Sequence, residues 1–125
     1  MADRRVFITG MGIISAMGHG VAATLKALQQ GSTGIRPLTL FPCPFEVPLP
    51  VGEVCDLPDA DEGIPRTHQL ALAAAHEALG DMPHAPDMVI MGVTTGGMLS
   101  TENYMKQGHR QPLFSRYHAA GSVAD

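Results

Sequence analysis

The hydrophobic pattern of the chain contains two short, continuous apolar runs, each followed by glycines. The first run covers residues 6–9 (Val-Phe-Ile-Thr) and the second covers residues 88–91 (Met-Val-Ile-Met). Uninterrupted apolar runs of this length are typical of strands that are buried on both faces of a parallel sheet. We therefore predict a buried strand at each of these two positions.

Helical periodicity follows the first run. Val21, Leu25 and Leu28 recur at helical spacing, and Gly31 stands where a helix commonly ends, which predicts a helix over residues 20–30.

The clearest predicted helix opens at Pro65 and ends at Gly80. One face of it carries small or apolar side chains, namely Leu70, Ala71, Ala74, Ala75 and Ala78. Small side chains let backbones approach, so we expect this face to pack closely against another element. A third helix is expected over residues 98–107, with Met98, Thr101 and Met105 on one side.

Residues 37–65 hold seven of the ten prolines, which excludes a long helix or a central strand there. Within this surface excursion, residues 51–54 can pair as a short edge strand. The order of elements is an α/β pattern, whose usual solution is a parallel sheet with right-handed crossovers. Two central strands and one edge strand are too few for a complete parallel sheet, which needs both of its faces covered. This segment alone would therefore leave apolar strand faces exposed.

The composition excludes several classes of partner. The chain has 125 residues, which allows one domain at most, and its formal net charge is −4. Because Lys and Arg form no cluster, a surface for nucleic acid or for an anionic membrane is not expected. No apolar stretch is long enough to span a bilayer, and the N-terminus does not read as a signal peptide, so we expect a cytoplasmic protein. Cys43 and Cys55 are then expected to be free thiols, neither of them catalytic.

Two glycine-rich stretches and the histidines are the remaining candidates for binding or catalysis. The glycine-rich stretch 10–18 lacks the third glycine of a dinucleotide fingerprint, since Ser15 stands there, and it lacks P-loop spacing. The six histidines show no metal-site spacing, so no metal is expected. The stretch 92–97 (Gly-Val-Thr-Thr-Gly-Gly) follows a predicted strand, where open α/β sheets place their ligands. From the residues alone, pocket lining and tight packing are equally good readings of it.

Several segments, in this order and spacing, resemble the β-ketoacyl-acyl carrier protein synthases of the condensing-enzyme (thiolase) superfamily. The matching segments are residues 5–18 (RVFITGMGIISAMG), 31–36 (GSTGIR), 52–54 (GEV), 70–79 (LALAAAHEAL), 89–97 (VIMGVTTGG) and 119–124 (AAGSVA).

The resemblance implies the N-terminal part of a thiolase-like layered α/β/α/β/α fold. It further implies decarboxylative condensation of an acyl thioester with malonyl-acyl carrier protein in fatty acid or polyketide biosynthesis. The implied assembly is a homodimer, and the only organic cofactor is the carrier's phosphopantetheine arm. By position, Thr95 falls where the family has a residue that gates the substrate pocket, and Phe114 corresponds to an aromatic residue of the pocket loop.

The family's nucleophilic cysteine and its two catalytic histidines have no counterpart here. Residues 1–125 are therefore expected to be a segment truncated before the catalytic cysteine and inactive alone. The alternative is a non-catalytic partner subunit that resembles a chain-length factor.

Overall fold

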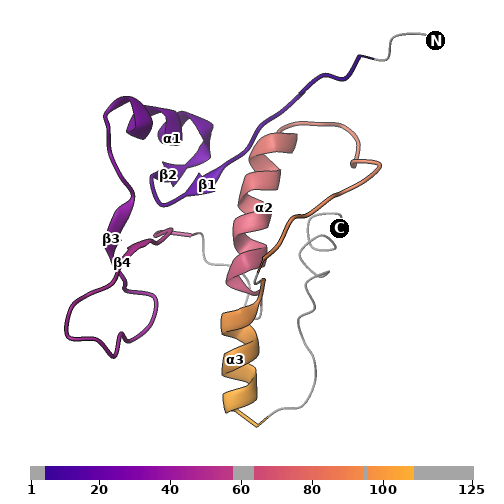
Figure 1. Cartoon of the computed structure of the whole chain (residues 1–125). Coiled ribbons are helices and arrows are strands. Elements are labelled where there is room, and N and C mark those ends of the chain that lie inside the picture. The colour runs from indigo at the N-terminus through magenta and orange to yellow at the C-terminus, as the bar shows by residue number, and fades with distance from the viewer. Residues whose placement is uncertain (1–4, 58–63, 95, 109–125) are drawn as a thin grey trace.

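The computed structural model describes residues 5–57, 64–94 and 96–108 (Figure 1). The described part of the chain contains both helices and short strands, which confirms the mixed α/β composition. In chain order the elements are β1 (Ile14–Ser15), β2 (Gly18–His19), α1 (Gly20–Gln29), β3 (Ile35–Pro37), β4 (Pro50–Gly52), α2 (Arg66–Leu79) and α3 (Met98–Lys106).

Helix α1 ends where the sequence predicts. Gly31 adopts a left-handed conformation with φ of 66°. Its N–H donates to the carbonyl of Leu28 at 3.0 Å, and the N–H of Ser32 donates to the carbonyl of Ala27 at 2.9 Å. This pair of bonds is a Schellman motif, which satisfies carbonyls that the end of a helix leaves without partners. The local glycine signal therefore sets the end of α1.

Helix α2 confirms the close packing predicted from its alanines. The backbone of Gly10 lies against Ala78 and that of Gly12 lies against Ala74, so close that a Cβ on either glycine would overlap backbone atoms of the helix. Gly80, with φ of 51°, follows the helix and donates from its N–H to the carbonyl of His76 at 2.9 Å. The N-terminal segment thus runs directly along the small-residue face of α2.

Strands β3 and β4 form an antiparallel ribbon that places Ile35 opposite Gly52 and Pro37 opposite Pro50. The expected edge strand is therefore confirmed at residues 51 and 52, although β4 begins one residue earlier and ends two residues earlier than the sequence indicates. Glu53 follows the ribbon and accepts from the N–H of Thr39 at 2.7 Å, from the hydroxyl of Thr39 at 2.9 Å and from the N–H of Leu40 at 3.2 Å. These bonds, led by the one from the Thr39 backbone, hold the pKa of Glu53 below its usual value.

The two predicted buried strands are wrong for this chain. Residues 6–9 and 88–91 lie outside all of its strands, and Val6, Ile8 and Ile90 are 94%, 85% and 86% exposed. A strand needs a neighbour to pair its N–H and C=O groups. Within the described residues, β1 pairs only with β2 and β3 only with β4, so neither run has such a neighbour. The side chains of both apolar runs are therefore exposed, as we expect for a segment with too few strands.

A small hairpin that the sequence did not predict precedes α1. β1 and β2 are antiparallel, with Ile14 opposite His19 and Ser15 opposite Gly18. The hydroxyls of Ser15 and Thr24 lie 3.4 Å apart, which connects the hairpin to α1. Thr24 and Ala27, both in α1, are buried. The hairpin and α1 thus form one small packed unit.

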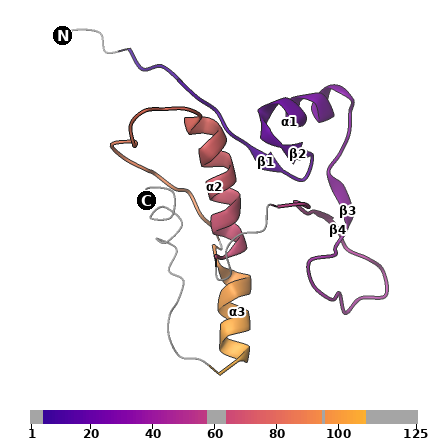
Figure 2. The ribbon, with the colours of Figure 1, turned by 180° about the vertical axis from the view of Figure 1, so that it is seen from behind.

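The segment that follows α2 turns back and runs alongside this helix toward its N-terminal end, as Figures 1 and 2 both show. Helix α3 begins there. The start of α2 and the start of α3 are consequently neighbours, although about thirty residues of chain separate them. This arrangement positions the candidate site.

Candidate functional site

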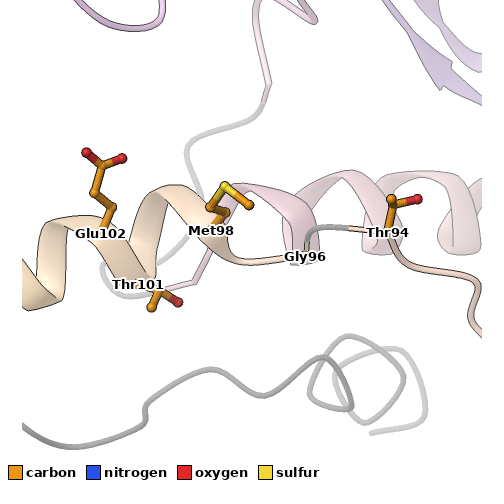
Figure 3. Close-up of a pocket in the computed structure, with 5 residues that line it drawn as sticks. All are labelled: Thr94, Gly96, Met98, Thr101 and Glu102. Carbon is orange, nitrogen blue, oxygen red and sulfur yellow. The ribbon is translucent and has the colours of Figure 1, made fainter.

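An open hollow of about 510 Å³ lies at the start of α3 (Figure 3). It is lined by Thr94, Gly96, Met98, Thr101 and Glu102. Met98 and Glu102, one helical turn apart, project from the same side of α3. The hollow therefore lies where the glycine-rich stretch 92–97 passes into the helix. Within this stretch Thr94 and Gly96 line the hollow while Gly97 is buried against α2, so both readings that the sequence left open describe part of it.

Gly97 forms the junction between the turn and α3. Its carbonyl accepts the first bond of the helix from the N–H of Thr101 at 2.9 Å, and its own N–H donates to the hydroxyl of Thr67 at 3.1 Å. Gly97 is buried and has φ of 74°, which favours glycine at this position. The turn beside the hollow is thus attached to the first turn of α2.

The lining of the hollow combines apolar and polar groups. Met98 supplies a flexible thioether side chain, and the two threonines supply hydroxyls that donate or accept hydrogen bonds. Glu102 is engaged with Lys106, with 2.7 Å between Oε1 and Nζ, in the favourable i, i+4 order. The lining therefore offers one flexible apolar side chain, two hydroxyls and one ion-paired carboxylate.

The opposite half of α2 holds the N-terminal segment through Glu77. Its carboxylate accepts from the N–H of Ile13 at 2.9 Å and from the N–H of Val21 at 2.7 Å. These two bonds, the first of them the stronger cause, lower the pKa of Glu77. Val21 lies in the first turn of α1, which has no acidic residue and no side-chain cap of its own. Glu77 therefore caps α1 from a different helix.

The cysteines are both free thiols, as the sequence predicts. Cys55 lies beside Arg36, whose Nη1 donates to its sulfur at 3.2 Å, and the Cys55 carbonyl lies 2.8 Å from Nε2 of His19. The Arg36 contact could not be seen from the sequence, since it depends on the pairing of β3 with β4.

The two residues predicted to contact substrate, Thr95 and Phe114, lie outside the described residues. The neighbours of Thr95 in the chain, Thr94 and Gly96, both line the hollow. The other glycine-rich stretch, residues 10–18, packs on the C-terminal half of α2 instead, so the structure does not bring the two stretches into one site.

Sequence reasoning did not single out Thr67 or Glu77. Glu77 stands within an alanine-rich helical segment, and Thr67 is an ordinary residue of a first helical turn. Their roles come from contacts with residues 30 to 64 positions away in the chain, for which neither residue carries a local signal.

Within the described ranges, no group of three or more His, Cys, Asp or Glu side chains is arranged to hold a metal ion. Across the same ranges, no helix has both the length and the apolar character needed to cross a membrane.

These features define a mixed α/β segment that presents a glycine-rich turn and an open, largely apolar hollow at the start of a helix. The chain is similar to several β-ketoacyl synthases, which confirms the resemblance seen in its motifs. It is 44% identical over 41 residues to 3-oxoacyl-[acyl-carrier-protein] synthase 2 of Coxiella burnetii, a match that covers 33% of this chain and 10% of that protein.

Two polyketide proteins match over longer stretches. The chain is 37% identical over 87 residues to the Oxytetracycline polyketide putative beta-ketoacyl synthase 1 of Streptomyces rimosus, covering 62% of this chain and 20% of that protein. It is 35% identical over 107 residues to the Tetracenomycin polyketide synthase ketoacyl synthase alpha subunit of Streptomyces glaucescens, covering 76% of this chain and 25% of that protein. The chain thus matches at most a quarter of the length of these three relatives.

No family model matches the chain. No solved structure matches it either.

Proposed function

We propose that this chain forms the N-terminal part of a β-ketoacyl-acyl carrier protein synthase with a layered α/β/α/β/α thiolase-like fold. The proposal is carried by the 107-residue similarity to a ketoacyl synthase alpha subunit, which spans most of the chain. The hollow at the turn 92–97 supports it, because an apolar surface beside a glycine-rich turn suits the acyl chain of a thioester substrate.

The proposed reaction is a decarboxylative Claisen condensation. An acyl group is first transferred from its carrier thiol to an enzyme cysteine, so one C–S bond breaks and another forms. Malonyl-acyl carrier protein then loses CO₂, and the electron pair of the broken C–C bond forms an enolate. The enolate carbon attacks the acyl carbonyl, a new C–C bond forms, and the cysteine thiolate leaves and is reprotonated. The products are a β-ketoacyl thioester, CO₂ and the free thiol of the first carrier.

The part assigned to this chain is substrate binding. Thr95 is proposed to gate the acyl pocket and Phe114 to line it, while Thr94, Gly96 and Met98 form the adjoining wall. The cysteine and histidines that make and break bonds lie outside these residues in the proposal, so the 125-residue chain alone is expected to be inactive.

The proposed partners follow from the same reaction. Acyl carrier protein presents both thioesters, and the synthase acts as a homodimer in the cytoplasm, where the free thiols of Cys43 and Cys55 persist. The reaction uses no metal and no organic group besides the phosphopantetheine arm of the carrier.

The test starts with the natural protein that carries this sequence. Its intact mass is measured under denaturing conditions, and CO₂ release from malonyl-acyl carrier protein is followed with octanoyl-acyl carrier protein present. We expect a mass well above that of these 125 residues, and equal amounts of CO₂ and β-ketodecanoyl product. The isolated 125-residue chain serves as the control and should release no CO₂.

Two other results would count against the enzyme. A larger protein that is inactive alone but raises the activity of a second ketosynthase would support the chain-length-factor-like subunit instead. A natural protein with the mass of these residues and no CO₂ release with or without a partner synthase would overturn both readings.

A further inference from the structure

The hydrogen bond between Gly97 and Thr67 joins two segments that are 30 residues apart in the chain. The N–H of Gly97 donates to the Thr67 hydroxyl at 3.1 Å in a partly buried setting. Thr67 belongs to the first turn of α2, and Gly97 immediately precedes α3. This bond therefore fixes the distance between the starts of two helices.

Gly97 is the N-cap residue of α3, and its N–H is one of the donors that the start of a helix leaves without a partner. In a capping box, a side chain three residues into the same helix satisfies this donor. Here the acceptor is instead the hydroxyl of Thr67, on a different helix. The first turn of α3 is thereby oriented by α2.

Residues on both sides of Gly97 line the hollow. Gly96 precedes it, while Met98 and Thr101 follow it. The turn is already tight, since a Cβ on Gly96 would lie 2.5 Å from Cγ1 of Val93. Movement of Gly97 would therefore move the wall of the hollow together with the first turn of α3.

We propose that Thr67 is a positioning residue, whose hydroxyl holds Gly97 and so sets the shape of the hollow at the start of α3. Thr67 does not line the hollow and acts through Gly97. That the hollow takes an acyl chain rests on the proposed function, whereas the hydrogen bond and its effect on α3 do not.

Amide hydrogen exchange at Gly97, measured in the natural protein that carries this sequence, tests the bond directly. In the unmodified chain we expect this amide to be protected. Thr67→Val keeps the side-chain shape but removes the acceptor, and it should accelerate exchange at Gly97 by roughly three- to tenfold. Thr67→Ser keeps the hydroxyl and should stay within about twofold of the unmodified chain.

The matched control is Thr33→Val, the same chemical change at an exposed loop residue. It should leave the exchange of Gly97 unchanged. The methyl resonance of Met98 should shift in Thr67→Val and return toward its original position in Thr67→Ser. Exchange of the Leu28 amide in α1 should be the same in all variants, which separates a local effect from global unfolding.

Equal exchange at Gly97 in Thr67→Val and Thr67→Ser would overturn the proposal. An unprotected Gly97 amide in the unmodified chain would overturn it without any variant, even if Thr67→Val failed to fold. Octanoyl-N-acetylcysteamine, titrated into the same samples, tests the proposed function separately. No binding to the unmodified chain would count against an acyl site in the hollow, while the exchange data would still decide the role of Thr67.

Discussion

The contact of Gly12 with α2 predicts a large penalty for adding a single methyl group there. A Cβ at this position would lie 2.8 Å from the Ala78 nitrogen and 2.9 Å from the Ala74 carbonyl carbon, and closer still to the Ala74 oxygen. All three atoms belong to helix backbone, so no side chain can rotate away. Because heavy atoms pack best near 3.5–4.0 Å, relieving the contact with the Ala74 oxygen would require the segment and the helix to separate by roughly 1.5 Å or more.

A separation of this size weakens the other contacts along the same face. A gap of about 0.5–1 Å forfeits a quarter to a half of each dispersion contact. It also displaces Ile13, whose N–H donates to Glu77. Overpacking of a tight contact usually costs about 1–3 kcal/mol. Since backbone lies on both sides here, we expect Gly12→Ala to lower the free energy of unfolding by about 3 kcal/mol, the upper end of that range.

The control is Gly92→Ala, because a Cβ at Gly92 meets nothing within 4 Å and its backbone is not left-handed. This variant should be neutral or more stable by about 0.4–1 kcal/mol, through a less flexible unfolded chain. Both variants are compared with the unmodified chain by urea unfolding, followed by far-ultraviolet circular dichroism.

The reasoning would be refuted by a Gly12→Ala variant whose stability lies within about 1 kcal/mol of the control. A second variant locates the clash. Ala74→Gly removes only a side-chain methyl, so combining it with Gly12→Ala should restore nothing. Recovery of stability in the double variant would show that the methyl of Ala74, and not the backbone of α2, is the obstacle.

Three further predictions follow. Hydrogen bonds from the N–H groups of Ile13 and Val21 lower the folded-state pKa of Glu77. The ionised Glu77 carboxylate therefore stabilises the fold above the unfolded-state pKa of Glu77, and this stabilisation is lost as the pH falls through the folded-state pKa. Glu77→Gln should therefore flatten the dependence of stability on pH below about pH 4.5 in acid titrations, and an unchanged slope would contradict this. Val6→Lys should change stability by less than about 0.5 kcal/mol and reduce binding of a hydrophobic dye, whereas a loss near 2 kcal/mol would mean that Val6 is buried in solution. A Cβ at residue 31 would meet no atom within 4 Å, but the φ of 66° is unfavourable for alanine. Gly31→Ala should therefore lower the free energy of unfolding, measured by thermal unfolding, by about 1 kcal/mol, and a neutral result would argue against the Schellman motif.

The helices could be predicted from the sequence because their signals are local. Gly31 and Gly80 end α1 and α2, and Pro65 directly precedes α2, each at the expected place. The alanine face of α2 also predicted a close neighbour, although not which one. These features depend on residues within one or two turns of each other, which a sequence pattern records.

The strands and the site residues could be predicted only in part. An apolar run such as residues 6–9 shows what a strand would bury, but pairing requires a neighbour that the run itself does not encode. The positions of Thr67 and Glu77 depend on how the turn 92–97 and the hairpin come to lie on α2. Such contacts arise from tertiary packing, and neither residue type is unusual in a helix.

Helix α2 positions both glycine-rich stretches, yet it contributes little buried apolar area. Val6, Phe7, Ile8, Met88 and Ile90 are each at least 74% exposed. Full burial of a large apolar side chain stabilises by about 1.5–3 kcal/mol, so covering these five would add on the order of 10 kcal/mol. That is comparable to the whole stability of an ordinary domain. The hydrogen bonds and close backbone contacts of α2 therefore decide where the turn at the hollow lies, since the two apolar runs contribute almost none of the burial that they could provide.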